Sequence, residues 1–260
     1  MTLKGKTAVV TGSTSGIGLG IAHALAKDGA SIVMNGLGTE KDNEKAIAEL
    51  KKHGTRVVFD PANMLRHNQI AEMIAKAQRD LGSVDILVNN AGIQHVAPIQ
   101  DFPPERFDLI LRLMLQSPFR LVQRVLPHMY DAGWGRVVNV SSAHGLRASP
   151  FKSAYVTAKH GLEGLSKVIA LEGANHGVTS NCVNPAYVRT PLVEKQIADQ
   201  ARSHGIPESE VLEKVLLEPV AVKRLIEPAE VADLVAFLCG PSSASISGSS
   251  FAMDGGWTAS

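Results

Sequence analysis

Short apolar runs alternate with longer amphipathic segments along almost the whole chain. The runs are rich in β-branched residues, which predicts buried strands at 7–11, 31–35, 56–60, 84–89, 136–141, 178–183 and 249–253. The segments between them have helical spacing and often end at glycine, which predicts helices at 16–28, 41–53, 67–81, 104–132, 153–176 and 230–239. Pro118 lies inside the helix expected at 104–132 and should kink or break it.

This alternation predicts an α/β fold, a doubly wound parallel sheet of the Rossmann type with helices on both faces. We expect residues 1–260 to form a single domain that combines dinucleotide binding and catalysis. The segment 187–228 has no strand pattern but carries charge and short helical patterns, so we expect a small helical lid before the last helix and strand. Ligands of such sheets bind where the strands end at their carboxyl edge.

Composition narrows the function without deciding it. The chain has 260 residues, of which 45% are hydrophobic and 20% charged, as in an ordinary globular domain. A net charge of +1 gives no support for a nucleic acid or a membrane surface as partner. No apolar signal segment and no run of about 18 apolar residues is present, so we expect a cytoplasmic protein. Cys182 and Cys239 are too few for a disulfide framework or a structural zinc site, and no metal is expected.

A glycine-rich loop follows the first expected strand and leads into the first helix. Its sequence is Gly12-Ser13-Thr14-Ser15-Gly16-Ile17-Gly18. Glycines let the backbone turn tightly and approach a pyrophosphate, and the helix N-terminus offers free N–H groups. The spacing differs from the commonest dinucleotide fingerprint, and glycines alone would also fit a plain turn. The place between strand and helix favours phosphate binding.

Tyr155 and Lys159 lie four positions apart in an expected helix and therefore share a face. A free tyrosine has a pKa of about 10, too high for a base near neutral pH. A cation about 4 Å away is worth about 4 kcal/mol at an effective dielectric near 20, enough to bring a phenol into range together with a cationic nicotinamide. The pair alone would also suit a helix surface. It gains weight from Ser141-Ser142 and Asn89-Asn90-Ala91-Gly92, which close two expected strands.

These motifs in this order resemble the short-chain dehydrogenase/reductase family over nearly the whole chain. The resemblance implies an oxidoreductase with a nicotinamide cofactor, and a homotetramer built partly from the two long helices. It implies that Ser142 orients the substrate oxygen, that Tyr155 is the acid/base, and that Lys159 holds the nicotinamide ribose and lowers the tyrosine pKa. The cofactor residues it implies are Gly12, Thr14, Ser15, Gly16, Ile17, Gly18, Leu37, Asn63, Met64, Asn90, Ala91, Gly92, Tyr155, Lys159, Pro185, Val188 and Thr190.

Within the family, the chain most resembles the branch that oxidises (R)-3-hydroxybutyrate to acetoacetate. The resemblance lies in the segments 90–95, 142–146, 152–155, 188–197 and 254–259. It implies substrate contacts from Gln94, Ser142, His144, Lys152, Tyr155, Tyr187, Gln196 and Trp257. Two amides, a histidine and a lysine suit a small carboxylate. Each of these residues also has an ordinary alternative, as a surface lysine, a loop histidine, a solvated amide or a core tryptophan.

Three positions depart from the family pattern. Met114 stands where an asparagine usually holds a water beside the catalytic lysine, and a thioether cannot hold that water in the same way. Asn63 stands where an aspartate is common, and Tyr187 stands where the hydroxybutyrate branch has tryptophan. The first departure puts catalytic efficiency in doubt, and the last puts the size of the pocket in doubt.

The cofactor is expected to be NAD. The residues after the second expected strand are Asn35-Gly36-Leu37-Gly38, with no arginine or lysine to bind a 2′-phosphate and no aspartate for a free 2′-hydroxyl. Two alternatives to the leading function stay open. One is an NAD(P)-dependent enzyme acting on another hydroxy or oxo compound, and the other is a weakly catalytic NAD-binding protein.

Overall fold

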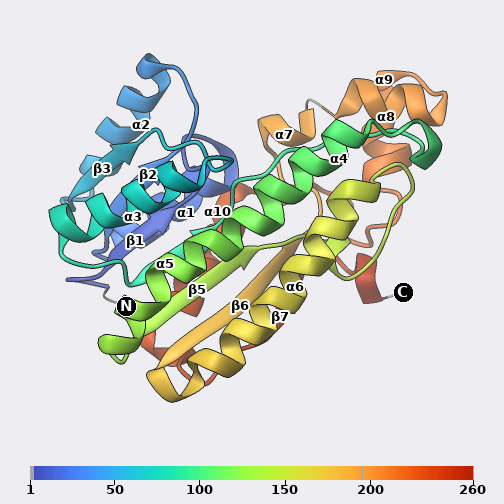
Figure 1. Cartoon of the computed structure of the whole chain (residues 1–260). Helices are drawn as coiled ribbons and strands as arrows, with labels where there is room; N and C mark the ends of the chain where they lie inside the picture. The colour runs from blue at the N-terminus through green and yellow to red at the C-terminus, as the bar shows by residue number, and fades with distance from the viewer. Residues whose placement is uncertain (1–2, 195, 260) are drawn as a thin grey trace.

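Seven parallel strands form one continuous sheet at the centre of the molecule. The structure is a computed structural model that describes residues 3–194 and 196–259. The strands are Thr7–Val10 (β1), Ser31–Asn35 (β2), Val57–Asp60 (β3), Ile86–Asn89 (β4), Gly135–Val140 (β5), Val178–Pro185 (β6) and Ser250–Met253 (β7). Their order is β3-β2-β1-β4-β5-β6-β7 (Figure 1). Strands β2 and β3 extend the sheet to one side of β1 and the last four strands extend it to the other, so the strand order reverses between β1 and β4. The predicted doubly wound sheet is confirmed.

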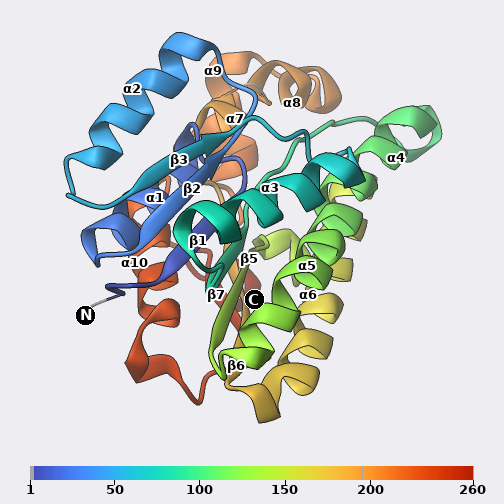
Figure 2. The ribbon, with the colours of Figure 1, turned by 60° about the vertical axis from the view of Figure 1, so that its left-hand side comes forward.

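Helices cover both faces of this sheet, as the turned view shows (Figure 2). The long helices are Gly16–Lys27 (α1), Glu40–Lys51 (α2), His67–Leu81 (α3), Pro104–Leu111 (α4), Ser117–Asp131 (α5), Ser153–Gly173 (α6) and Pro228–Cys239 (α10). Val10 packs in the apolar cluster with α1, α2 and α10, whereas its neighbour Val9 packs in the cluster with α3, α5 and α6. Successive strand residues thus serve opposite faces, which is why the strands read as continuous apolar runs.

The helix expected at 104–132 is interrupted one turn before Pro118. Arg112–Gln116 forms a π-helical turn between α4 and α5, in which the amide of Ser117 donates to the carbonyl of Arg112. Pro118 has no N–H, and its ring would crowd the carbonyl of Met114 in a regular α-helix. The wider turn relieves that crowding. It also places Met114, which is 1% exposed, against the site described below.

The segment 187–228, predicted to be a lid, folds into short helices beside the carboxyl edge of the sheet. They are Pro191–Glu194 (α7), Ile197–His204 (α8) and Glu208–Val211 (α9), followed by a π-turn at Leu212–Leu216. The two ends of the segment meet in a parallel bridge between Val188 and Ile226. An apolar cluster that includes Val211, Leu216 and Tyr187 packs the segment against Trp257.

Three further expectations concern absences in the part of the chain that is described. No helix there is long and apolar enough to cross a membrane. No group of three or more histidine, cysteine, aspartate or glutamate side chains is arranged to hold a metal ion among those residues. Cys182 and Cys239 are buried free thiols.

Candidate active site

A cavity of about 490 Å³ opens at the carboxyl edge of the sheet, across the point where the strand order reverses. The glycine loop, the ends of β4, β5 and β6, and helix α6 all contribute to its wall. Every residue predicted to bind cofactor or substrate lines this one cavity, except Gly18 and Trp257. The fold therefore gathers predicted site residues from positions 12 to 196 around one cavity.

The glycine loop has the conformation that its glycines were expected to permit. Gly12 and Gly16 have positive φ angles of 62° and 55°, which favour glycine. A Cβ on Gly18 would lie 2.3 Å from the carbonyl oxygen of Gly12. Gly18 therefore allows close packing of α1 against the loop and does not itself face the cavity. The side-chain amide of Asn90 donates to the carbonyls of Thr11 and Gly12, which fixes the loop to the end of β4.

A dinucleotide fits this loop. Ser15 is the N-cap of α1, yet its side chain makes no capping hydrogen bond and the first turn of the helix holds no acidic residue. Ser15, Gly16 and Ile17 all line the cavity. The positive end of the helix and its unclaimed amides are thus presented to the cavity, as phosphate binding requires.

The far end of the cavity lies beyond β2. Asn35 is buried there and donates to the carbonyls of Asp60 and Ala62, while Leu37 is 75% exposed at the rim. Among the described residues that line the cavity, the lysines and arginines are Lys152 and Lys159 alone. Both belong to the segment of α6, and neither follows β2. The end that would receive an adenine ribose thus presents no arginine or lysine.

The three predicted catalytic residues meet at the ends of β5 and α6. The hydroxyl of Ser142 donates to the carbonyl of Pro185 at 3.3 Å and lies near enough to Tyr155 to oppose the rise in the pKa of its phenol. The ammonium of Lys159 lies 5.4 Å from the centre of the Tyr155 ring and donates to the carbonyl of Val140 at 2.6 Å. Serine, phenol and ammonium thus line one continuous wall of the cavity.

Burial sets the protonation of this group. It raises the pKa of Tyr155 to about 12, against the opposing effect of the hydrogen bond from Ser142. It lowers the pKa of Lys159 to about 8, against the opposing charges of Cys182 and Glu163. The phenol is therefore a protonated donor near neutral pH. Positive charge brought close to the phenol oxygen would favour the phenolate.

Lys152 lies at the N-cap of α6 and is 2% exposed. Its ammonium donates to the hydroxyl of Tyr187 at 3.1 Å and lies 4.9 Å from the centre of that ring. No carboxylate lies within ion-pair distance of it among the described residues. Burial lowers the pKa of Lys152 to about 8, so the side chain is mostly a cation near neutral pH. A buried cation without a carboxylate partner is a strong candidate to bind an anionic ligand.

His144 contacts Ser142, the serine predicted to be catalytic. Its Nδ1 lies 3.3 Å from the hydroxyl of Ser142, and its Nε2 lies 3.1 Å from the hydroxyl of Ser149. Burial, followed by the charge of Lys152, lowers the pKa of His144 well below its usual value, so the ring is neutral. A neutral imidazole can hydrogen-bond a substrate oxygen without adding charge.

The remaining predicted substrate residues occupy different depths. The side-chain carbonyl of Gln196 is buried without a hydrogen-bond partner, while its amide donates to the carbonyl of Leu192. Gln94 accepts from the amide of His95 at 3.0 Å. Trp257 lies outside the cavity wall, stacked against Tyr187 with ring centres 6.0 Å apart. It supports the wall from behind.

Several lining residues were not predicted. Leu109 and Leu113 lie one helical turn apart near the π-turn, and Leu192 and Val193 come from α7. The spacing of the first two was visible as an apolar face, but the direction of that face depends on tertiary packing. Met114 also lines the cavity, where its Sδ would lie 3.7 Å from a Cβ on Gly92.

Comparisons with known proteins agree with this architecture. The family profile described as short chain dehydrogenase matches residues 6–201. A protein of Rhizobium meliloti (strain 1021) named D-beta-hydroxybutyrate dehydrogenase is 51% identical over 98% of this chain and 99% of its own length. A protein of the same name from Cupriavidus necator is 49% identical over 99% of both chains. The crystal structure of a protein assigned as a short-chain alcohol dehydrogenase from Sinorhizobium meliloti 1021 superposes with a TM-score of 0.87 at 30% identity, covering 100% of this chain and 98% of that one.

A doubly wound sheet with this loop and this serine–tyrosine–lysine site defines an oxidoreductase of the Rossmann type. The chain belongs to the short-chain dehydrogenase/reductase family, whose dehydrogenases use nicotinamide cofactors.

Proposed function

We propose that the protein oxidises (R)-3-hydroxybutyrate reversibly to acetoacetate with NAD. The observation that carries the proposal is the buried ammonium of Lys152, which has no carboxylate partner among the described residues and lines the same cavity as Tyr155. A small hydroxy acid needs a hydroxyl site and a carboxylate site in one cavity. Two relatives at about half identity are named for this substrate.

The carboxylate site has the right chemistry for a small anion. Lys152 supplies charge, and Gln196 lines the same cavity, where its side-chain NH2 would donate to an anion after leaving the carbonyl of Leu192. Gln94 and neutral His144 offer further hydrogen bonds without adding charge. Because the lysine is desolvated, its attraction for an anion is stronger than that of a surface lysine.

Proton transfer falls to Tyr155. When bound, the nicotinamide supplies the acceptor for the hydride that leaves the hydroxyl-bearing carbon. Ser142 holds the substrate oxygen, and Tyr155 takes the hydroxyl proton during oxidation and returns it during reduction. Lys159 stabilises the phenolate by its charge. The high pKa of Tyr155 in the unliganded site means that oxidation depends on these nearby cations, so we expect its rate to rise with pH.

NAD is proposed over NADP because the ribose end of the cavity has no cation. A 2′-phosphate placed near Leu37 would meet no arginine or lysine on the cavity wall, whereas a 2′-hydroxyl needs no charged partner. The lining amide of Asn63 can hydrogen-bond an adenine as well as an aspartate could.

The test is NADH formation by the purified protein with (R)-3-hydroxybutyrate, compared with the (S) isomer and with NADP. We expect (R)-selective, NAD-dependent turnover. Lys152→Ala and Gln94→Ala should raise the KM for the acid, by about 10- to 100-fold for the lysine, because a charge-assisted hydrogen bond is lost. Lys51→Met, which removes an exposed lysine on α2 outside the cavity, is the matched control and should change nothing.

Two results would reject the assignment. An unchanged KM in Lys152→Ala would separate the lysine from the substrate carboxylate. Binding of NADH without turnover of any short hydroxy acid would favour the weakly catalytic alternative, which Met114 motivates.

A further inference from the structure

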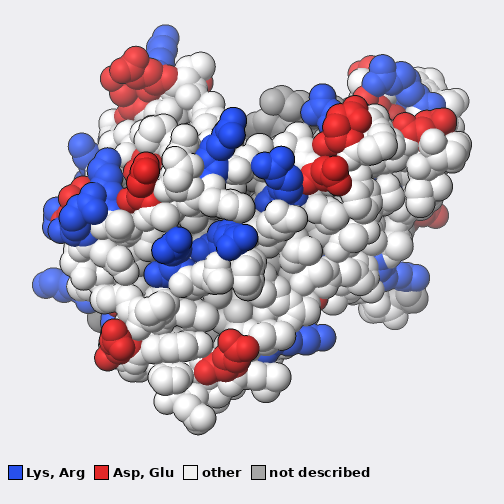
Figure 3. All heavy atoms as spheres, viewed as in Figure 1, with Lys and Arg blue, Asp and Glu red and all other residues white. Residues whose placement is uncertain are grey.

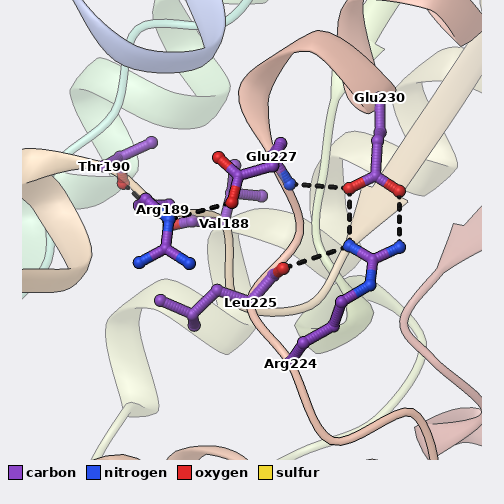
Figure 4. A network of polar contacts seen from close by, with 7 residues as sticks. All are labelled: Val188, Arg189, Thr190, Arg224, Leu225, Glu227 and Glu230. Atoms are coloured by element: carbon purple, nitrogen blue, oxygen red, sulfur yellow. Dashed lines mark hydrogen bonds and ion pairs between the residues drawn. The ribbon is translucent and has the colours of Figure 1, made fainter.

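A second cavity of about 290 Å³ lies behind the active site. It is bounded by the lid segment near residues 217–226, the end of β7 and the turn that follows it. Most of its wall is apolar, from Leu217, Val220, Val222, Ile226, Ala252 and Met253. The charged groups on its wall are Arg224 and Glu230, which bind each other through two hydrogen bonds (Figure 4), and Asp254, whose carboxylate accepts from the amides of Gly256 and Thr258. An apolar cavity beside a catalytic centre suits a hydrocarbon chain.

One stretch of chain separates the two cavities. Among the described residues, Ala186 and Tyr187 are the ones that line both. The backbone of Tyr187 is held in place, because its carbonyl accepts from the amide of Ile226 at 3.0 Å. Its side chain is held by the bond from Lys152 and by stacking on Trp257. The aromatic side chain is thus the larger part of the partition, and it is held at both its hydroxyl and its ring face.

The same side chain borders the space for a bound hydroxy acid, because it lines the active-site cavity and its hydroxyl accepts from the ammonium of Lys152. Ser142 and Tyr155 take the hydroxyl and Lys152 takes the carboxylate, as the proposed function requires. The rings nearest this group are His144, whose centre lies 5.8 Å from that of Tyr155, and Tyr187, whose centre lies 6.4 Å from that of His144. These rings form the wall of the active-site cavity on the side of the second cavity.

We infer that Tyr187 is a chain-length gate, whose ring restricts the site to short hydroxy acids and closes it off from an apolar cavity able to take the tail of a longer 3-hydroxy acid. This inference rests on the proposed function. A 3-hydroxyhexanoate or 3-hydroxyoctanoate would keep its carboxylate on Lys152 and extend its alkyl tail past residue 187. Removal of the ring joins the two spaces.

The experiment compares kcat/KM for 3-hydroxybutyrate, 3-hydroxyhexanoate and 3-hydroxyoctanoate in the full-length protein. In Tyr187→Ala we expect the ratio of hexanoate to butyrate activity to rise about tenfold or more, since two further methylenes become buried. Tyr187→Phe keeps the ring and removes only the hydroxyl, so it should keep the preference for the short acid. An equal loss on all three acids in Tyr187→Ala would overturn the gate.

A second substitution tests whether the gain uses the second cavity. Ala252 is exposed on β7 and lines that cavity alone of the two, so Ala252→Phe should fill it with little risk to the fold. Added to Tyr187→Ala, it should abolish the gain on longer acids, while alone it should leave 3-hydroxybutyrate turnover unchanged. Persistence of the gain in the double variant would show that the tail lies elsewhere and would overturn the inference.

The two proposals fail in different ways. Absence of 3-hydroxybutyrate turnover by the unaltered protein would reject the proposed function. In that case the chain-length preference is measured as the affinity for butyrate, hexanoate and octanoate. Tryptophan fluorescence reports binding, because Trp257 stacks on Tyr187. Turnover of 3-hydroxybutyrate with no change of chain-length preference in Tyr187→Ala would reject the gate alone.

Discussion

The buried charge of Lys152, which the proposed function uses to bind the substrate carboxylate, lowers the stability of the folded protein. Burial lowers its pKa from 10.5 to about 8, which corresponds to about 3 kcal/mol against the charged form in the folded protein. Below pH 8 this cost is present in full. As pH rises from 8 to 10.5, the folded protein loses the proton before the unfolded chain does, so the cost disappears.

We therefore expect Lys152→Met to be more stable than the unaltered protein at pH 7, by about 1–3 kcal/mol, with the difference shrinking above pH 8. Urea unfolding at several pH values measures this. Butyrate should raise the stability of the unaltered protein and leave Lys152→Met unaffected. A destabilised Lys152→Met at pH 7 would contradict the prediction.

The chemistry of single residues was easier to predict than their surroundings. The spacing of Tyr155 and Lys159 predicted a shared helix face, and both residues line the cavity. The sequence could not show that Lys152 is buried at the N-cap, because that burial comes from residues near 187. For the same reason it could not tell that Trp257 supports the wall without lining the cavity.

At the scale of elements, the two ends of the lid are tied together beside α10. Arg224 binds Glu230, and Arg189 binds Glu227, next to the bridge between Val188 and Ile226 (Figure 4). Hydrogen bonds from Arg224, above all, lower the pKa of Glu230 to about 2, so the pair persists at neutral pH. We propose that the segment between these ties moves as a lid.

We expect Arg224→Met to loosen the lid, with a rise of a few-fold in the KM for the hydroxy acid and faster cleavage of the segment by a glutamate-specific protease. The matched control is Arg202→Met, which removes an exposed ion pair within α8 and leaves both ends tied. High salt should narrow the difference between Arg224→Met and the unaltered protein, because these groups are exposed. Equal cleavage rates in the two variants would argue against the tie.

Among the elements, the regular strands and helices followed from periodicity, whereas the turns of unusual geometry did not. Pro118 signalled an interruption, but the π-turn at Arg112–Gln116 depends on how the chain relieves the crowding one turn earlier. The short helices of the lid have too few turns to carry a periodic signal. These are also the elements that place Met114 and Leu192 at the cavity.

For the whole molecule, the layered order of the sheet was predictable because right-handed crossovers leave few ways to arrange alternating strands and helices. Figure 3 shows a surface on which basic side chains gather across the middle of one face, over the region of α5. Helices α5 and α6 run side by side there in both ribbon views (Figures 1 and 2). The net charge of +1 gave no sign of this grouping, since it sums over all faces.

Apolar side chains on this pair of helices support the homotetramer that the family resemblance implies. Leu171 and Val168 on α6 are 79% and 50% exposed, and Phe119 on α5 is 43% exposed. Burying such a leucine against a second copy is worth about 1.5–3 kcal/mol. We therefore expect light scattering after size exclusion to find four chains of 27.6 kDa, and Leu171→Arg to shift the mass toward smaller species on dilution. Ile99→Arg is the matched control, because Ile99 is 78% exposed and lies outside these helices.

A monomeric unaltered protein, or the same shift in both variants, would exclude these helices as the site of assembly. A smaller assembly in Leu171→Arg that keeps its turnover would show that each chain carries a complete active site, as the single continuous cavity indicates.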